Sequence, residues 1–274
     1  MVLFPHAKIN LGLNVLARRP DGFHDIESVL VPIPLCDALE AVIDPSLDTN
    51  DLVYTRSGLP ISGDLGTDLC HRAVRMLQNI RPLPGLRLHL HKVTPMGAGL
   101  GGGSSDGAHT LLLVDRLCQL GLEAEELEAN AAVLGSDCAF FLQNKACLAR
   151  GRGEILEPLD LDLRGLRLVL INPGLHVSTA EVYRNTVPTG RSWDFSTLLQ
   201  RDRIQSWQTT VINTMEDHVL RTHPAIADIK ARLLRGGAIY AAMTGSGSSV
   251  FGLFKEAPGE LALPNGCRSW TFDL

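Results

Sequence analysis

The sequence predicts an α+β protein built from two lobes. Alternating apolar residues predict a strand over 85–93, a glycine-rich stretch follows at 95–108, and the apolar run after it predicts a helix that ends at Gly121. Further along, 191–235 has a mostly helical pattern, and 238–254 has the pattern of two strands joined by a glycine turn. A chain of 274 residues can form one large domain or two ordinary ones, and we expect two.

The first expected element is a strand over residues 7–15. Its apolar face carries Ile9, Leu11, Leu13 and Val15, and its other face carries Lys8, Asn10, Gly12 and Asn14. A lysine on a strand often only guards a sheet edge against pairing, and an asparagine is usually solvated. The turn that follows shifts the interpretation of this polar face towards a functional one.

A tight turn is predicted at Pro20, Asp21 and Gly22, so the chain folds back as a hairpin. The hairpin carries Phe23 and His24 alongside the first strand. Taken singly, Phe23 reads as core filling and His24 as a surface residue. Taken together, they can hold a heteroaromatic base by stacking and hydrogen bonding.

The glycine-rich stretch "PMGAGLGGGSSDGA", residues 95–108, carries the main functional signal. Its six glycines in fourteen residues need a reason, and a chain without Cβ atoms can turn its N–H groups towards a polyanion. Ser104 and Ser105 are candidate N-caps of the following helix, and Asp106 suits the positive end of its dipole. A helix start fed by such a loop predicts a phosphate site, whereas the ordinary alternative is a mobile surface linker.

Two familiar phosphate-binding motifs do not fit this loop in full. It lacks the Lys-Ser or Lys-Thr pair of a P-loop. Gly97, Gly99 and Gly102 match the dinucleotide pattern G-x-G-x-x-G, but residues 122–134 predict a second helix where that fold needs a strand. We therefore expect a different kind of phosphate-binding protein.

Two later segments allow both a structural and a functional interpretation. Asp137 follows Gly135, which ends the second helix, and is either the N-cap of the next element or a buried carboxylate that needs a cation such as Lys8. The stretch "MTGSGSSVFGLF", residues 243–254, is either an ordinary glycine hairpin or a turn that faces an active-site cleft.

The composition excludes several classes of partner. With 25 basic and 30 acidic residues, the net charge of −5 does not indicate a basic surface that would bind nucleic acid or an anionic membrane. The six cysteines form no C-x-x-C pair, the beginning of the chain has no apolar export segment, and no apolar run reaches the roughly eighteen residues of a membrane span. We expect a cytoplasmic protein in a reducing compartment, with neither nucleic acid nor membrane as partner.

Seven motifs carry a resemblance to a known family: "AKINLGL", "RRPDGFH", "PMGAGLGGGSSDGA", "LGSDCAFFL", "GRGEIL", "NPG" and "MTGSGSSVFGLF". From about Ala7 to Phe254, the chain resembles the 4-diphosphocytidyl-2-C-methyl-D-erythritol kinases of the galactokinase, homoserine, mevalonate and phosphomevalonate (GHMP) kinase superfamily. The resemblance implies an N-terminal ATP-binding and catalytic lobe at 1–160 with a ribosomal protein S5 domain 2-like fold. It also implies a ferredoxin-like C-terminal α/β lobe at 161–274 that completes the substrate cleft.

The implied activity is ATP-dependent phosphorylation of the 2-hydroxyl of 4-diphosphocytidyl-2-C-methyl-D-erythritol. This reaction gives the 2-phosphate and ADP in the non-mevalonate (methylerythritol phosphate) isoprenoid pathway. The substrate is thus a small-molecule cytidine diphosphate, and ATP is the phosphoryl donor. Because the sequence has no dedicated metal cluster, Mg²⁺ is expected to arrive with the ATP, and we expect a monomer or a weak homodimer.

The resemblance also implies roles for single residues. Lys8 and Asp137 match the family's catalytic lysine and aspartate, the aspartate accepting the proton of the substrate hydroxyl. The positions that match substrate contacts are Asn10, Phe23, His24, Thr179 and Tyr183, with Phe23 and Tyr183 placed to sandwich the cytosine ring. The positions that match the ATP loop are Pro95, Met96, Gly97, Ala98, Gly99, Leu100, Gly101, Gly102, Gly103, Ser104 and Ser105.

Departures from the family pattern occur at three places. Phe23 stands where many relatives have tyrosine, which keeps the stacking face and drops the hydroxyl. Thr67 and Asp68 stand where relatives often have Asp-Asn near the adenine, which leaves the adenine contacts open. Gly107 replaces a common alanine, and we expect it to weaken the loop helix by roughly 0.5 to 1 kcal/mol.

Two alternative functions remain at this point. Another superfamily kinase, with homoserine or mevalonate as acceptor, would not need Phe23, His24 and Tyr183 around a pyrimidine. An oxidoreductase or other dinucleotide-binding module would use the G-x-G-x-x-G match.

Overall fold

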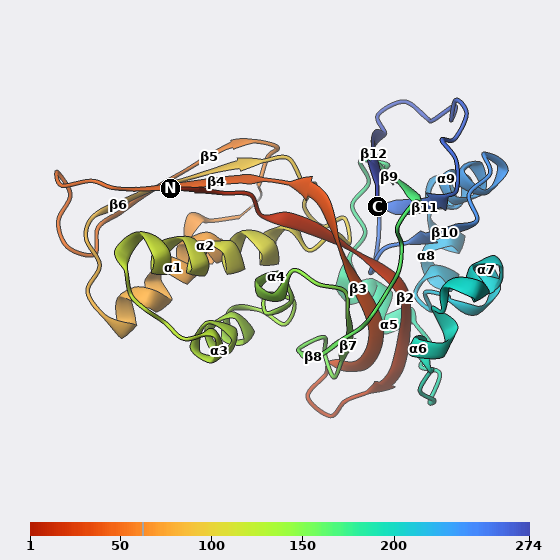
Figure 1. The fold of residues 1–274 in the computed structure, drawn as a ribbon, viewed down its shortest axis with the longest axis horizontal. Helices are drawn as coiled ribbons and strands as arrows, with labels where there is room; N and C mark the ends of the chain where they lie inside the picture. Colours follow the sequence, from red (N-terminus) through yellow and green to blue (C-terminus); the bar gives the residue numbers. More distant parts are fainter. Residues whose placement is uncertain (62) are drawn as a thin grey trace. The chain divides into compact units, whose positions relative to one another are not determined.

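The computed structural model describes residues 1–61 and 63–274, and the chain forms two compact units (Figure 1). Unit 1 comprises residues 1–7, 34–96 and 101–144, and unit 2 comprises residues 8–33, 97–100 and 145–274. Both units combine helices with sheets, so the α+β prediction is confirmed.

The two compact units do not follow the expected contiguous boundary near Asp160. The hairpin of β2 (His6–Arg18) and β3 (His24–Cys36) lies mostly in unit 2. Its sheet has the order β2-β3-β7-β8, with β7 at Cys147–Arg150 and β8 at Ile155–Pro158. Strand β3 pairs with β7, more than a hundred residues later in the sequence. The N-terminal hairpin therefore belongs to the same unit as the C-terminal half of the chain. The functional division at residue 160 stays a prediction.

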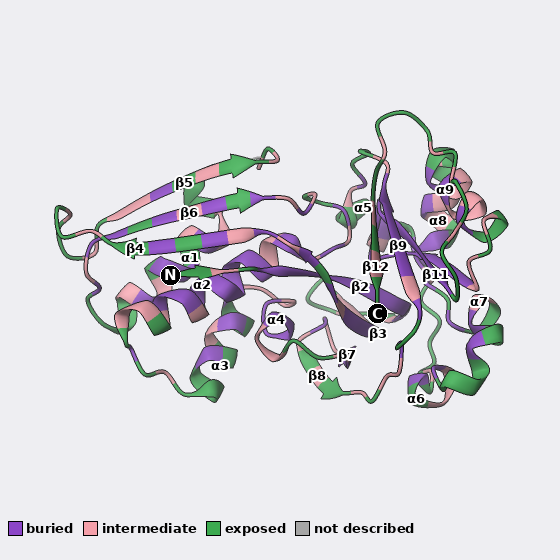
Figure 2. Cartoon of the chain, turned by 45° about the horizontal axis from the view of Figure 1, so that its top comes forward, coloured by how far each residue is buried: buried purple, intermediate pink, exposed green. Residues whose placement is uncertain are grey.

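Unit 1 is a four-stranded sheet covered on one face by helices (Figure 1). Its order is β1 (Val2–Leu3), β4 (Ala38–Ile43), β6 (Leu86–Lys92) and β5 (Leu52–Gly58), with β5 parallel to β6 and the other pairs antiparallel. The strand predicted over residues 85–93 is therefore confirmed as β6. Figure 2 shows buried and more exposed residues alternating along it, with the three leucines and Lys92 on the buried face.

The helices of unit 1 include the two that the glycine loop was expected to precede. They are η1 (Leu65–Thr67), α1 (Leu69–Ile80), α2 (Gly102–Cys118), α3 (Ala124–Leu134) and α4 (Phe140–Gln143). α2 ends at Cys118, before the predicted end, because Gln119 already has a left-handed conformation with φ of 52°. α3 begins with a capping box between Glu123 and Glu126 and confirms the second helix.

In unit 2 the β2–β3 hairpin shows the predicted turn. The Arg19 N–H donates to the Phe23 carbonyl at 2.8 Å, and Gly22 takes φ of 86°, a conformation that favours glycine. The second sheet is antiparallel with the order β10-β11-β9-β12. These strands are β9 (Arg167–Asn172), β10 (Tyr240–Met243), β11 (Val250–Phe254) and β12 (Arg268–Asp273).

The helices of unit 2 begin with one at Thr179–Asn185, and the others confirm the helical pattern predicted between residues 191 and 235. They are α5 (Thr179–Asn185), α6 (Phe195–Leu198), η2 (Arg201–Ser206), α7 (Trp207–Thr210), α8 (Glu216–Thr222) and α9 (Pro224–Arg235). Leu13, Val15 and Ile26 from the hairpin are buried in one apolar cluster with residues of β9, β10, β11, α8 and α9. Burial of this apolar surface holds the hairpin to the C-terminal sheet and helices.

Candidate active site

The polar face of β2 is buried rather than solvated. The Lys8 residue is 4% exposed and Asn10 is 3% exposed. The Lys8 ammonium donates to Asn10 Oδ1 at 2.5 Å and to the Gly99 carbonyl at 2.9 Å. A buried charge needs such partners, so Lys8 is not the edge guard of the ordinary interpretation. Asn10, a predicted substrate contact, is here a partner of the predicted catalytic lysine.

The Asn10 amide is held by two residues that the sequence analysis did not select. Asn10 Nδ2 donates to Ser28 Oγ at 2.8 Å, and the Thr244 hydroxyl lies 3.2 Å from Asn10 Oδ1. Thr244 Oγ1 also accepts the Asn10 backbone N–H at 3.0 Å and lies 3.0 Å from the Gly99 carbonyl. The glycine turn that contains Thr244 was the signal for it, whereas Ser28 had no signal beyond its place on the hairpin.

The segment 97–100 belongs to unit 2 and packs on the turn between β10 and β11. Gly97 and Gly99 have φ of 61° and 77°, and a Cβ on Gly99 would collide with the Thr244 carbonyl oxygen. The Ser249 N–H donates to the Ala98 carbonyl at 3.2 Å, and the Lys8 N–H donates to the Leu100 carbonyl at 3.0 Å. Glycine is therefore required at position 99 because the Thr244 backbone lies so close to it, and not only for binding a ligand.

The start of α2 belongs to unit 1 and differs from the predicted capping. Gly101, with φ of 69°, is the N-cap, so Ser104 and Ser105 lie inside the first turns and are not caps. The turn into the helix needs a left-handed residue, and glycine adopts it without strain. The first N–H groups of such a helix have no partner within the helix, and they suit an anion.

Asp106 was expected to face the helix dipole, but it lies in a buried ion cluster. Lys92 Nζ is 2.5 Å from Asp106 Oδ2 and 2.5 Å from Asp37 Oδ2. Asp37 also accepts the N–H groups of Val93 and Thr94. Burial lowers the pKa of Lys92, but the two carboxylates outweigh it and raise that pKa overall, so Lys92 keeps its charge and ties β6 to α2.

Asp137 lies half-buried in the turn at 136–139 between α3 and α4. It is not the N-cap of α4, because that position is taken by Ala139. The structural alternative for Asp137 is therefore wrong, which leaves a carboxylate without a capping role. Asp137 belongs to unit 1 and Lys8 to unit 2, and their pairing stays a prediction.

Three predicted base-binding residues lie in unit 2. The rings of His24 and Tyr183 are stacked, with centroids 5.0 Å apart and planes at 29°. Phe23 is 52% exposed, and the Arg152 guanidinium lies 4.9 Å from its ring centroid. Partial burial, with a contribution from the Arg18 charge, lowers the pKa of His24 and favours the neutral ring. The structure thus pairs Tyr183 with His24, and the predicted sandwich by Phe23 and Tyr183 remains a prediction.

Thr179, the last predicted substrate contact, is the first residue of α5. Its hydroxyl lies 2.9 Å from Ser246 Oγ in the β10–β11 turn. Ser178, the N-cap of α5, accepts the Glu181 N–H. Within unit 2, the glycine turn therefore contacts Thr179, Asn10 and the segment 97–100, which favours its functional interpretation.

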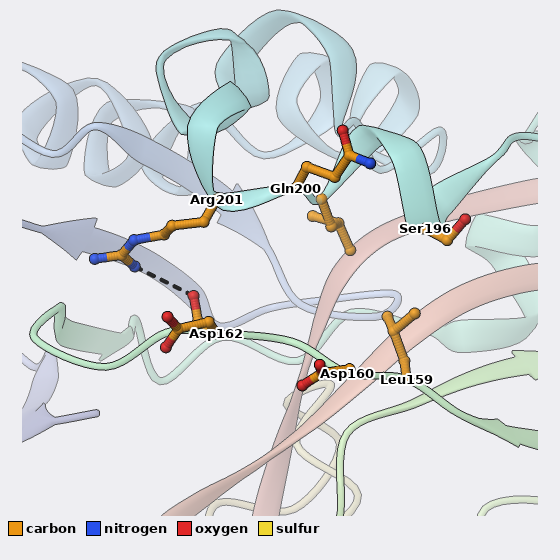
Figure 3. A pocket seen from close by; sticks show the side chains of 7 residues that line it. Leu159, Asp160, Asp162, Ser196, Gln200 and Arg201 are labelled. Atoms are coloured by element: carbon orange, nitrogen blue, oxygen red, sulfur yellow. Dashed lines mark hydrogen bonds between the residues drawn. The ribbon is translucent and has the colours of Figure 1, made fainter.

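A hollow of about 230 Å³ on unit 2 contains none of these residues (Figure 3). It is lined by Leu159, Asp160, Asp162, Ser196, Leu199, Gln200 and Arg201. The Arg201 guanidinium donates to the carbonyls of Asp162 at 3.2 Å and Arg164 at 3.1 Å. These bonds fasten the 160–165 segment to η2, so this cation serves a structural contact.

Within residues 1–61 and 63–274, each helix is too short or too polar to cross a bilayer. In the same ranges, no three residues among His, Cys, Asp and Glu are grouped as ligands for a metal ion. All six cysteines are free thiols.

Comparison with known proteins identifies relatives of this chain. The family described as "GHMP kinases N terminal domain" matches residues 68–145, and "GHMP kinases C terminal" matches residues 197–268. The 4-diphosphocytidyl-2-C-methyl-D-erythritol kinase of Azobacteroides pseudotrichonymphae is 44% identical over 256 residues, which are 93% of this chain and 94% of that protein. The kinase of the same name from Parabacteroides distasonis is 42% identical and matches over 100% of both chains.

Solved structures agree with these sequence matches. A crystal structure of 4-(cytidine 5'-diphospho)-2C-methyl-D-erythritol kinase has a TM-score of 0.76 at 34% identity, covering 92% of this chain and 90% of that one. Mevalonate kinase of Methanococcus jannaschii, at 13% identity and a TM-score of 0.67 over 99% and 97% of the chains, shares the fold. The resemblance carried by the seven motifs is confirmed, and the chain belongs to the 4-diphosphocytidyl-2-C-methyl-D-erythritol kinase family of the GHMP kinases.

Proposed function

We propose that this protein transfers the γ-phosphoryl group of ATP to the 2-hydroxyl of 4-diphosphocytidyl-2-C-methyl-D-erythritol. The products are ADP and the 2-phosphate, an intermediate of the non-mevalonate isoprenoid pathway. Relatives with this name match almost the whole chain. The structural observation that carries the proposal is the buried Lys8 ammonium, held by Asn10 and by a carbonyl of the glycine segment. Phosphoryl transfer requires fixed positive charge of this kind.

We assign the triphosphate of ATP to residues 95–105. The unpaired N–H groups at the start of α2 and the positive end of its dipole attract phosphate. A Cβ on Gly103 would meet only the flexible end of Met96, at 3.5 Å. Protein packing therefore does not require glycine at this position, whereas close approach of a bulky anion does. Bound Mg²⁺ would compensate phosphate charge, and the hydroxyl of Ser104 is an oxygen ligand of the kind it prefers.

We assign proton acceptance to Asp137 and charge compensation to Lys8. The substrate hydroxyl loses its proton as the new P–O bond forms, and a carboxylate within hydrogen-bond reach can accept it. Transfer proceeds directly from ATP to the alcohol, so the protein forms no covalent intermediate. Its contribution is to position the two substrates and to compensate the developing negative charge.

Recognition of the cytosine ring is assigned to Phe23, His24 and Tyr183, with Asn10 and Thr179 nearer the transferred group. The aromatic faces supply stacking and the His24 nitrogens supply hydrogen bonds. Because the His24 ring already stacks on Tyr183, a cytosine that stacks on that same face of Tyr183 would have to displace His24.

The decisive assay offers the protein Mg-ATP together with one alcohol at a time. The alcohols are 4-diphosphocytidyl-2-C-methyl-D-erythritol, homoserine and mevalonate, and both ADP release and the ³¹P spectrum of the product are recorded. We expect ADP and a new phosphomonoester only with the cytidine substrate. Turnover of homoserine or mevalonate instead would assign the protein to another GHMP specificity. Family membership already removes the oxidoreductase alternative.

We further propose that the enzyme is cytoplasmic and acts as a monomer or a weak homodimer. Its partner is a small molecule, and the net charge of −5 supports neither a nucleic acid nor an anionic membrane as ligand. Light scattering across a hundredfold range of protein concentration tests the oligomeric state.

A further inference from the structure

We propose that Ser28 is a positioning residue that aims the Lys8 ammonium by fixing the orientation of the Asn10 amide. The inference rests on the proposed function, in which Lys8 compensates charge on the transferred phosphoryl group. All three residues lie on the β2–β3 hairpin of unit 2 and are at most 4% exposed, and Ser28 is completely buried. Water is therefore a poor substitute for any partner that is lost among them.

Each atom of the Asn10 amide has a specific partner. Lys8 Nζ donates to Asn10 Oδ1 at 2.5 Å, and Asn10 Nδ2 donates to Ser28 Oγ at 2.8 Å. An ammonium has only donors, whereas an amide has an acceptor at one end and donors at the other. The hydrogen bond from Lys8 to Asn10 therefore forms only if the amide presents its oxygen.

Ser28 favours the orientation in which the amide oxygen faces Lys8. Its hydroxyl donates to the Gly12 carbonyl at 2.7 Å, so its single proton is engaged and it offers Asn10 only lone pairs. A flipped amide would place Oδ1 against these lone pairs and Nδ2 against the Lys8 ammonium. Both contacts would be repulsive, and the observed orientation is therefore strongly favoured.

The backbone at Gly12, whose carbonyl accepts from Ser28, is closely packed. Gly12 has φ of 77°, and a Cβ there would lie 2.7 Å from Phe195 Cε1 and 2.9 Å from Val211 Cγ1. Both the positive φ and the two nearby apolar side chains disfavour any residue other than glycine at this position. A chain of contacts thus runs from Phe195 through Gly12, Ser28 and Asn10 to Lys8.

The first test compares Ser28→Ala with a matched control, Thr186→Val. Thr186 is also buried in unit 2, and its hydroxyl also donates to a backbone carbonyl, that of Val182 at 2.8 Å. In Ser28→Ala we expect kcat to fall roughly ten- to a hundredfold, because a misplaced group slows the chemical step. The KM values for ATP and the cytidine substrate should stay within about twofold. Thr186→Val should leave kcat unchanged.

A double-mutant cycle separates positioning from a general packing defect. If Ser28 acts through the amide, Ser28→Ala lowers kcat in the wild-type background and has no further effect in Asn10→Ala. An equal loss in both backgrounds would overturn the proposal. A rise in the substrate KM without a fall in kcat would also overturn it, since it would show that the Asn10 amide serves substrate binding and not the position of Lys8. Ser28→Cys, with nearly the same volume and weaker hydrogen bonds, replaces the alanine variant if that does not fold.

A spectroscopic measurement tests the same inference without turnover. The chain has five lysines, so the ¹⁵N signals of the side-chain ammonium groups can be assigned with a Lys8→Arg variant. In Ser28→Ala the Lys8 signal should shift and broaden, whereas that of Lys92, held between two carboxylates, should not change. An unchanged Lys8 signal would refute the proposal. If wild-type protein phosphorylates no alcohol, the proposed function fails while this comparison still decides the role of Ser28.

Discussion

Individual side chains of the candidate site differ in how firmly the protein holds them. Lys8 and Asn10 are nearly fully buried and hydrogen-bonded within unit 2. Asp137 lies half-buried in a turn, and Phe23 is 52% exposed. The group to which we assign charge compensation is thus held by the protein itself, whereas the proposed proton acceptor and the proposed base-stacking ring are more exposed.

Asp137→Asn tests the assigned proton acceptor. The amide has the same shape and cannot accept the proton of the hydroxyl, so we expect kcat to fall about 10²-fold or more. ATP binding should persist and can be followed by the rise in Tm that the nucleotide produces. Full turnover in this variant would remove Asp137 from the mechanism.

His24→Ala tests the base-recognition assignment. Loss of the ring removes a stacking partner of Tyr183 and a neutral hydrogen-bonding group, so the KM for the cytidine substrate should rise at least about tenfold. Steady-state kinetics should show little change in the KM for ATP. Equal changes in both KM values would indicate a general structural defect instead.

At the scale of elements, α2 connects the glycine loop to the core of unit 1. Gly107 on this helix was expected to be a weak point because glycine is a poor helix former. The structure gives it a packing role instead. A Cβ on Gly107 would lie 2.8 Å from Leu69 Cβ and 2.9 Å from Leu134 Cδ2, so the missing side chain lets α1 and α3 approach α2.

Gly107→Ala should therefore destabilise the protein, contrary to helix propensity. The gain of roughly 0.5 to 1 kcal/mol from propensity is opposed by overpacking, which typically costs about 1 to 3 kcal/mol. Urea denaturation monitored by circular dichroism measures the net change. Gly103→Ala, on the same helix and with only the end of Met96 within 4 Å, is the control and should stabilise the protein by up to roughly 0.5 to 1 kcal/mol, because the propensity gain is unopposed. A stabilised Gly107→Ala would show that the helices move apart easily.

His109 on α2 predicts a dependence of stability on acid. Burial lowers its pKa to about 4, below the value of about 6.5 in the unfolded chain. Between these values the unfolded chain binds more protons, so the free energy of unfolding falls as pH decreases through this window. From pH 7.5 to pH 5 the contribution of His109 falls by about 2 kcal/mol. His6, which contacts this ring edge-on and whose pKa burial also lowers, acts in the same direction.

Denaturation curves at pH 7.5 and pH 5 check this prediction. His109→Gln should show a smaller loss of stability between the two pH values than the wild type. Leu113→Ala, which removes a buried side chain of α2 without a titratable group, should be less stable by the same amount at both. Equal pH slopes in the wild type and His109→Gln would contradict the low pKa.

At the scale of the whole molecule, the elements that depend on local sequence patterns could be predicted from the sequence. Strand β6, the glycine loop, α2 and α3 follow from periodicity and glycine content within short windows. The burial of Lys8 does not, because it depends on residues 97–100 and Thr244, distant in sequence. The start of α2 was misplaced because a left-handed glycine, Gly101, caps it in place of a serine.

Local sequence patterns also could not predict how the chain divides into units. This division predicts how a fragment of the chain should fold. Residues 161–274 lack the hairpin residues Leu13, Val15 and Ile26, which are buried in the core of unit 2. They also lose the hydrogen bond from the Thr214 N–H to the Leu13 carbonyl. We expect this fragment alone to melt without a cooperative transition, in contrast to the full chain, when followed by circular dichroism. A sharp native-like transition would favour the contiguous boundary.

The close fit of Gly99 against the Thr244 carbonyl has a consequence for how such enzymes diversify. Two glycine-rich stretches separated by more than a hundred positions constrain each other, since a side chain added at Gly99 would collide with the Thr244 carbonyl. A chimera that receives the β10–β11 turn of a distant kinase should need residues 97–100 from the same donor. Exchanging either stretch alone should displace the carbonyl that Lys8 contacts.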